Sequence, residues 1–231
     1  MQDTQFSFEH IIVDGASTDN SLDIARHYQC TAENVIIKSE KDSGIYNAMN
    51  KGLALASGSH IAFLNSGDIL ARNGVINDIF AALKRNQSIE FLYGNLCFID
   101  DYDLIKRVWT SGNFTKFKLF IGWMPPHPMT TICKKILIEN KGFNERLKIA
   151  ADYDLMLRIL LLPNVVVEYL PVTFVHMETG GVSNGSLAGI IKSNIEVIKS
   201  WRNNRGHAVP YWLFFIKPII KLTQLRRRKL K

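Results

Sequence analysis

The segment Phe8–Asp14 has the sequence FEHIIVD, a β-branched apolar run that ends in a carboxylate. A run of this kind, bounded by turn residues, predicts a buried strand. Ser17, Thr18 and Asp19 follow it and can cap a helix, which we expect to extend to about Tyr28. This stretch therefore predicts a strand and a helix joined by a polar turn.

The same alternation continues downstream. Apolar runs predict strands at 35–37 and 60–64, and apolar residues at helical spacing predict a helix at 45–57 between them. This order is typical of an α/β fold with a mostly parallel, doubly wound central sheet flanked by helices. In such sheets the ligand lies outside the carboxyl ends of the strands. Polar clusters occupy three of these ends, at 14–19, 40–44 and 65–68.

The second half of the chain is less regular. Its predicted elements are strands at 91–100 and 105–109, helices at 136–140 and 152–160, one or two strands at 165–175 and a helix at 186–201. We see no repeat, low-complexity tract or linker that divides this part. We therefore expect one domain over residues 1–205 and a separate tail over residues 206–231.

The composition is that of a folded globular protein. Hydrophobic residues make up 47% of the 231 residues and charged residues 21%, which argues against a disordered chain. No apolar stretch reaches the roughly 18–20 residues of a spanning helix, and no export signal is evident. Cys30, Cys97 and Cys133 lack metal-ligand spacing and suit a reducing compartment. We expect a cytoplasmic protein without disulfides.

The net charge of +7 is concentrated at one end of the chain. Residues 217–231 contain seven basic residues and no acidic one, and removing these seven from 28 leaves 21 basic residues against 21 acidic ones. The remainder of the chain is therefore neutral. This distribution argues for a basic tail and against a nucleic-acid-binding groove across the fold.

The first polar cluster contains Asp14, which stands at a predicted strand end beside small residues. Its carboxylate can accept hydrogen bonds from a ribose or a base, and the small neighbours let a ligand approach the backbone. The alternative is an ordinary turn in which Asp19 only caps the following helix, and such turns are common.

The second polar cluster precedes a predicted helix. Asp42 stands before Gly44 at the helix start, where backbone N–H groups and the helix dipole favour an anion. Asn47, Asn50 and Lys51 are polar residues in the first two turns. They can contact a ligand, or they can form a solvated helix face.

The third polar cluster ends in Asp68. An oxygen ligand after a buried strand can hold Mg²⁺ or Mn²⁺ against the two phosphates of a nucleotide. A metal site usually has more protein ligands than a single carboxylate, so the alternative role for Asp68 is that of an ordinary turn residue.

The three clusters, taken together and in this order, resemble family 2 glycosyltransferases, the inverting enzymes with the GT-A fold. The residues that carry the resemblance are VDGASTDNS (13–21), SEKDSGIYNAMNKGL (39–53) and SGSHIAFLNSGD (57–68). It continues through PPHPMTTICKK (125–135), IAADYDLMLRI (149–159) and GGVS (180–183). The pattern is most similar to enzymes of colanic-acid-type exopolysaccharide biosynthesis.

The resemblance implies roles for several carboxylates. Asp14 and Asp42 fall where the family contacts the base and ribose of the nucleotide, and Asp68 falls on the last carboxylate of its metal-binding motif. Asp152 falls at the position of the catalytic base, although Ala151 stands where the family often has Glu. A helix N-cap is the alternative role for Asp152.

Two histidines are candidate substrate contacts, the first because it matches a position of the family and the second because of its place in the chain. His127 lies in the acceptor-side loop, and His176 precedes Gly180-Gly181, a predicted flexible loop that would carry it towards a metal or phosphate. For each histidine the alternative is a satisfied surface or structural side chain.

The predicted tail joins an apolar, aromatic stretch at 211–222 to a basic end. The apolar part is too short to span a bilayer, but aromatic residues beside Lys and Arg suit the interface of an anionic leaflet. The alternative is a helix that docks on the core with a solvated basic end. We expect a protein bound peripherally to the inner face of the plasma membrane.

These observations predict transfer of a sugar from a nucleoside diphosphate sugar to a hydroxyl of a saccharide acceptor, which family resemblance suggests is lipid-linked. Two alternatives remain open: an inactive nucleotide-sugar-binding or scaffold protein, and a peripheral membrane adaptor. The resemblance also implies a strand and helix preceding the Phe8–Val13 strand. We therefore expect either that this strand lacks a partner along one edge or that another segment lies beside it in place of the implied strand.

Overall fold

The computed structural model describes residues 7–100, 102, 104–178, 187–205, 212 and 225–229. Its elements are β1 (His10–Asp14), α1 (Ser21–Thr31), β2 (Val35–Ser39), α2 (Ile45–Leu55), β3 (His60–Ala62), β4 (Ile69–Leu70), α3 (Val75–Arg85), β5 (Phe91–Ile99), β6 (Leu104–Trp109), α4 (Lys116–Phe120), β7 (Thr131–Cys133), α5 (Lys134–Glu139), α6 (Ala151–Leu160), β8 (Val167–Glu178), α7 (Leu187–Arg205) and β9 (Leu225–Lys229). The alternating strands and helices predicted for the first half are confirmed, with shifted ends.

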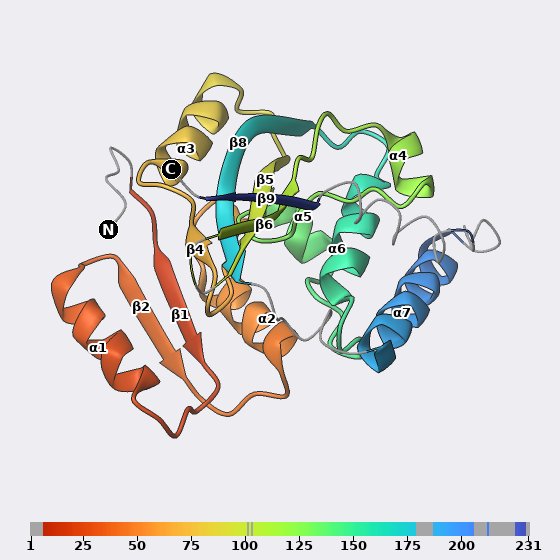
Figure 1. Ribbon diagram of the computed structural model, residues 1–231. Coiled ribbons are helices and arrows are strands. Elements are labelled where there is room, and N and C mark those ends of the chain that lie inside the picture. Colours follow the sequence, from red (N-terminus) through yellow and green to blue (C-terminus); the bar gives the residue numbers. More distant parts are fainter. Residues whose placement is uncertain are drawn as a thin grey trace.

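The strands form two sheets rather than one (Figure 1). β1 and β2 pair in parallel as a two-stranded sheet, and the other seven strands form a mixed sheet whose longest path is β3-β7-β5-β6-β9. Within this larger sheet only β5 and β8 are parallel, whereas the pairings of β3, β4, β6, β7 and β9 are antiparallel. The prediction of a mostly parallel sheet is therefore wrong, because β3 joins the antiparallel second half of the chain instead of β1.

β1 has one strand neighbour among the described residues. Its register with β2 runs from the pair His10–Val35 to the pair Asp14–Ser39, and β3, which pairs with β7, belongs to the other sheet. Within the described part of the chain the second edge of β1 has no partner strand, as expected for this segment.

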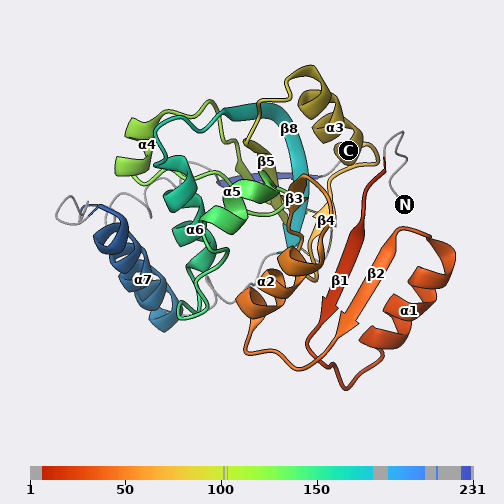
Figure 2. The ribbon, with the colours of Figure 1, turned by 180° about the vertical axis from the view of Figure 1, so that it is seen from behind.

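Helices cover both sheets (Figures 1 and 2). α1 packs on β2 and α2 packs on β1, while α3 buries Val75, Ile79 and Ala82 against β5 and β8. α6 is the central helix, with eight of its ten residues buried. α7 packs on α6 through Trp201, which is fully buried. The main core therefore lies under α6, beside the predicted catalytic segment.

The parallel pair β5–β8 forms the centre of the larger sheet. β5 is buried along its length except at Asn95, as expected for a strand covered on both faces. A side chain at Gly94 would place Cβ 2.6 Å from the Phe174 ring and 2.7 Å from the Val172 carbonyl oxygen. Glycine is therefore required for the close approach of β8, where the register shifts.

The predicted tail contributes to the sheet. β9 pairs antiparallel with β6, from Leu104–Lys229 to Arg107–Leu225. Residues 225–229 of the predicted tail therefore pair with the sheet of the domain, and the boundary after residue 205 stays a prediction. No helix in the ranges given above is both long and apolar enough to cross a bilayer.

Candidate active site

The ends of β1 and β2 bring Asp14 and Asp42 together. Asp14 is the last residue of β1, and a Cβ on the neighbouring Gly15 would lie 2.5 Å from Oδ2 of Asp42. Only a residue without a side chain permits this approach of the Asp42 carboxylate to the β1 turn. The Asp42 carboxylate thus lies against Gly15, the residue that follows Asp14, at the ends of the parallel strands β1 and β2.

Asp14 is held in the ionised form by hydroxyl and backbone donors. The Ser39 hydroxyl donates to Oδ2 at 2.6 Å, and the Ser17 hydroxyl and backbone N–H donate to the same carboxylate. These hydrogen bonds, with the Ser17 side chain first, hold the pKa of Asp14 below its usual value. The carboxylate is therefore an oriented acceptor for hydroxyl or N–H groups.

Asp42 lies in the turn that precedes α2. The Gly44 N–H donates to Asp42 Oδ1 at 2.9 Å, and Gly44, with φ 130°, is the helix N-cap. The positive φ explains why glycine stands here. Downstream, Lys51 contacts Glu40 at 3.0 Å and donates to the Lys41 carbonyl at 2.9 Å. The turn that presents Asp42 is thus fixed at both ends.

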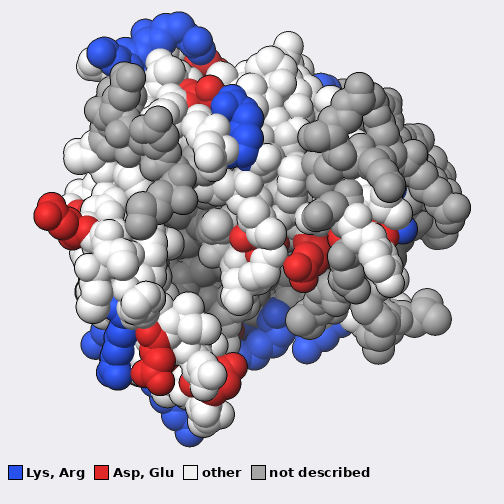
Figure 3. Space-filling model, turned by 60° about the vertical axis from the view of Figure 1, so that its left-hand side comes forward, with Lys and Arg blue, Asp and Glu red and all other residues white. Residues whose placement is uncertain are grey.

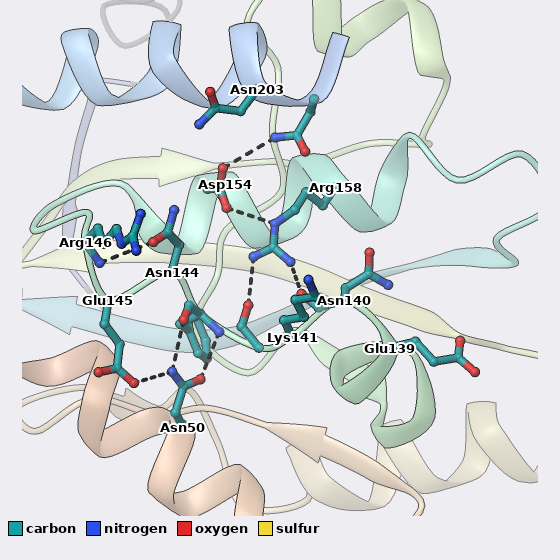
Figure 4. Close-up of a pocket in the computed structure, with 13 residues that line it drawn as sticks. Asn50, Glu139, Asn140, Lys141, Asn144, Glu145, Arg146, Asp154, Arg158 and Asn203 are labelled. Atoms are coloured by element: carbon teal, nitrogen blue, oxygen red, sulfur yellow. Dashed lines mark hydrogen bonds and ion pairs between the residues drawn. The ribbon is translucent and has the colours of Figure 1, made fainter.

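Asn50 joins α2 to the loop after α5 (Figure 4). Its Nδ2 donates to the Phe143 carbonyl at 3.0 Å and to Glu145 at 2.7 Å, and its Oδ1 accepts the Phe143 N–H at 2.8 Å. Asn47 also donates to Glu145, at 3.0 Å. These contacts occupy both Nδ2 protons, so Asn50 positions the loop, a structural use that the substrate-binding prediction did not include.

Asp152 lies in the first turn of α6, next to α2. The hydroxyl of Tyr46 lies 3.4 Å from Asp152 Oδ1 and donates to the Ile149 carbonyl at 2.7 Å. Burial first, and then the charge of Asp152, raise the pKa of the Tyr46 phenol, which therefore stays protonated. Tyr46 connects the predicted base to the helix that begins beside Asp42.

Glu196 fixes the segment that leads into α6. Its carboxylate accepts the N–H groups of Lys148 at 3.1 Å and of Ile149 and Ala150 at 2.9 Å each. Only 6% of Glu196 is exposed. These N–H groups lie at the N-terminal end of α6, where the helix dipole stabilises a negative charge such as the Glu196 carboxylate. Glu196 is therefore a positioning residue for Asp152.

His127 is buried in the aromatic core beside this site. Its ring stacks on Phe63 at 5.8 Å between centroids and meets Phe143 edge-on at 5.6 Å. Neither ring nitrogen has a hydrogen-bond partner among the described residues. Burial lowers the pKa of His127, while the nearby Asp152 acts in the opposite direction. His127 is thus a neutral imidazole close to the predicted base.

Asp68 fits a cation-binding role. Burial raises its pKa to about 6, with a smaller contribution from Glu178 in the same direction, and its Oδ2 has no partner among the described residues. β4 pairs with β8, which places Ile69 opposite His176. A divalent ion would give the buried carboxylate oxygen a partner and offset its charge.

The protein would supply few ligands to such an ion. The described residues contain no group of three or more His, Cys, Asp or Glu side chains with metal-binding geometry. Mg²⁺ and Mn²⁺ often take one or two carboxylates and complete their shells with phosphate oxygens and water. The predicted Gly180-Gly181 loop lies outside the described residues.

A cleft of about 680 Å³ lies beyond the Asn50 contacts (Figure 4). Arg158 on its wall donates to Asp154 at 2.9 Å, to the Gly142 carbonyl at 2.7 Å and to the Asn140 carbonyl. Asp14, Asp42, Asp68 and Asp152 do not line it. The position of the predicted carboxylates, rather than the volume of this cleft, defines the candidate site.

Sequence reasoning missed Tyr46, Glu145 and Glu196. Tyr46 and Asn50 are four residues apart and hence on one face of α2, a signal that could have assigned both to one interface. Glu145 and Glu196 have no local signal, because their partners are distant in sequence: Glu145 is about 95 residues from Asn50, and Glu196 is 46–48 residues from its partners.

Comparisons with known proteins show the family of the chain. The profile described as "Glycosyl transferase family 2" matches residues 2–143. A "PGL/p-HBAD biosynthesis glycosyltransferase" of Mycobacterium bovis is 30% identical over 190 residues, which cover 77% of this chain and 68% of the relative.

Two solved structures share the fold. S. aureus TarS 1-349 in complex with UDP-GlcNAc superposes with a TM-score of 0.63 at 17% identity, over 86% of this chain and 66% of TarS. The mannosyltransferase PcManGT from Pyrobaculum calidifontis, in complex with GDP-Man and Mn²⁺, superposes with a TM-score of 0.58 at 13% identity. This superposition covers 91% of this chain and 64% of PcManGT. The chain thus spans less than two thirds of each solved chain, and the predicted GT-A-like fold is confirmed.

Proposed function

Because the chain belongs to glycosyl transferase family 2, we propose that it transfers a sugar from a nucleoside diphosphate sugar to an acceptor hydroxyl with inversion. The position of Asp152 carries the proposal. Asp152 begins α6 and lies beside Tyr46 of α2, the helix that starts at the Asp42–Gly44 turn. The proposed base and the proposed nucleotide-binding Asp42 are therefore linked through α2, which begins at the Asp42–Gly44 turn and carries Tyr46.

Asp152 accepts the proton of the acceptor hydroxyl as its oxygen attacks the anomeric carbon. The bond from that carbon to the diphosphate oxygen breaks, and its electron pair leaves with the nucleoside diphosphate. A single displacement from the opposite face inverts the anomeric centre. General-base assistance of this kind contributes about 10²–10⁴-fold to the rate.

Asp14 and Asp42 bind the nucleoside of the donor. The Asp14 carboxylate, oriented by two serine hydroxyls, and the Asp42 carboxylate, which lies against Gly15, are suited to accept hydrogen bonds from ribose hydroxyls and from N–H groups of a base. The N–H groups at Gly44 and the start of α2 suit the diphosphate. The solved relatives hold UDP-GlcNAc and GDP-Man, both donors of this class.

Asp68 would hold Mg²⁺ or Mn²⁺, and His176, which lies opposite Ile69 on the neighbouring strand, is the second residue that we assign to the ion or the phosphates. When bound, such an ion would offset the charge that develops on the departing diphosphate. The unpartnered Oδ2 of Asp68 supports this assignment.

The acceptor is a saccharide, and we place it on a lipid at the cytoplasmic face of the plasma membrane, in surface polysaccharide biosynthesis of the colanic-acid type. The resemblance of residues 39–53 to that group and the basic C-terminal residues support this context. We assign His127, a neutral imidazole near Asp152, to the acceptor side of the site.

Nucleotide release from a panel of UDP- and GDP-sugars, with lipid-linked saccharide acceptors and Mn²⁺, tests the proposal. We expect turnover with at least one donor and a loss of about 10²–10⁴-fold in D152N, with donor affinity unchanged. D23N, a change at an exposed α1 carboxylate, is the matched control. Donor binding without turnover by the wild type would indicate an inactive nucleotide-sugar-binding protein instead.

A further inference from the structure

The outward face of α7 combines apolar and basic side chains. Ile190, Ile191 and Ile195 are 40%, 54% and 44% exposed, and its exposed cations are Lys192, Lys199 and Arg202. The single acidic residue between 189 and 204 is Glu196, which is buried and bonded to the 148–150 backbone. No carboxylate therefore offsets the charge on this face.

α4 extends the same surface. Phe120 packs on Trp201 of α7 with ring centroids 5.0 Å apart, while Phe117 is 71% and Ile121 39% exposed. The indole N–H of Trp212, itself half-exposed, donates to the Phe120 carbonyl at 2.7 Å. Residues 113–123 include two lysines and no acidic residue. We call these exposed residues of α4 and α7, with Trp212, the α4–α7 face.

The α4–α7 face lies on one side of the molecule, opposite α1 (Figures 1 and 2). On the side that carries α1, acidic and basic side chains are interspersed (Figure 3). The α1 side thus carries both signs of charge, whereas residues 113–123 and the exposed positions of α7 include lysine and arginine but no carboxylate.

We propose that the α4–α7 face binds the surface of an anionic membrane, with α7 lying in the interface. Isoleucine and phenylalanine side chains would enter the boundary of the headgroups, and lysine and arginine would contact anionic lipids. Each basic residue near such a surface contributes about 1 kcal/mol. A second copy of the chain is a poorer occupant, because two faces that carry only positive charge repel each other.

This inference rests on the proposed function and narrows its acceptor. Glu196 projects from the buried side of α7 onto the segment before Asp152, while Ile191 and Ile195 are exposed on the helix. A helix is about 10 Å across, so the catalytic base would lie roughly one helix diameter from the membrane surface. A hydroxyl on a lipid-linked saccharide near the headgroups would reach it.

The proposal is tested by flotation of the full chain with anionic vesicles. The vesicles contain phosphatidylcholine and about 30% phosphatidylglycerol. We expect the wild type to bind and I191E/I195E and F117E to bind at least tenfold more weakly. I24E, a change at an α1 isoleucine that is 68% exposed, should bind like the wild type. Thermal unfolding of each variant checks that it is folded.

Equal binding by folded I191E/I195E, F117E and wild type would overturn the proposal and assign any binding to other residues. A second outcome would also overturn the proposal. If I191E/I195E still binds vesicles, and if sedimentation shows a dimer for the wild type but not for this variant, the face serves self-association. Donor hydrolysis without vesicles reports separately on the proposed function, since none of these residues lies in the candidate active site.

Discussion

The hydroxyl of Tyr46 lies 3.4 Å from Oδ1 of Asp152, although the two residues are 106 positions apart in sequence. Tyr46 follows the Asp42–Gly44 turn on α2, and Asp152 begins α6. The contact joins α2, which begins beside the proposed donor-binding residue Asp42, to the start of α6, which carries the proposed base. Movement of either helix would therefore change the position of the proposed base relative to the proposed donor site.

Y46F should slow transfer without weakening donor binding. The variant loses the 2.7 Å hydrogen bond to the Ile149 carbonyl and the contact with Asp152, so the base becomes less well positioned. We expect kcat to fall roughly tenfold to a hundredfold, the range for a small misplacement of a reacting group. Steady-state kinetics should show donor KM within about twofold of wild type; a rise in KM alone would contradict a positioning role.

E196A should lower both stability and turnover. Three backbone N–H groups before Asp152 lose a charged acceptor in this variant. A hydrogen bond to a charged group contributes about 1.5–3 kcal/mol to stability. We expect urea unfolding to show a loss of about 3 kcal/mol in the free energy of unfolding. K199A, an exposed change on the same helix, should cost less than about 0.5 kcal/mol. Equal losses in both variants would remove Glu196 from this role.

Stability should fall with rising pH through the titration of Asp68. Burial raises its pKa to about 6 in the folded protein from 3.8, so the folded state holds the proton more tightly and its contribution is lost between about pH 4 and pH 6. D68N should therefore unfold at higher urea than wild type at pH 7.5 and at similar urea at pH 4.

Mn²⁺ should stabilise the folded protein by binding the ionised Asp68 carboxylate, whereas ionisation alone destabilises it. At pH 7.5 it should raise the melting temperature of the wild type, because an ion that binds only the folded state stabilises it. The D68N protein should not respond. A shift of equal size in both proteins would place the ion elsewhere.

A16G should stabilise the protein. Ala16 has φ 64°, and the left-handed region costs a residue with Cβ about 1–2 kcal/mol, part of which glycine loses again in unfolded-state entropy. We expect a gain of about 0.5–1 kcal/mol in the free energy of unfolding. A81G, at an exposed position on α3, should lose about 1 kcal/mol, and a loss at both positions would mean that Ala16 is not strained.

The sequence by itself determined the local elements and the order of the polar clusters. The runs at Phe8–Asp14 and 91–100 became β1 and β5, and the apolar spacing after residue 151 became α6. These elements follow from patterns within about ten residues. Val75, Ile79 and Ala82 have the same helical spacing, so α3 was also within reach of the sequence although it was not predicted.

Tertiary structure alone decided which strands pair and which polar groups meet. Alternating strands and helices predict elements but not the direction of each partner, so the antiparallel β3–β7 pair and the β6–β9 pair were missed. The uses of Asn50 and Glu196 and the stacking of His127 on Phe63 depend on partners at least 46 residues away. A side chain's type is local, but its role is set by long-range packing, which places an amide, a carboxylate or an imidazole against backbone, solvent or ligand.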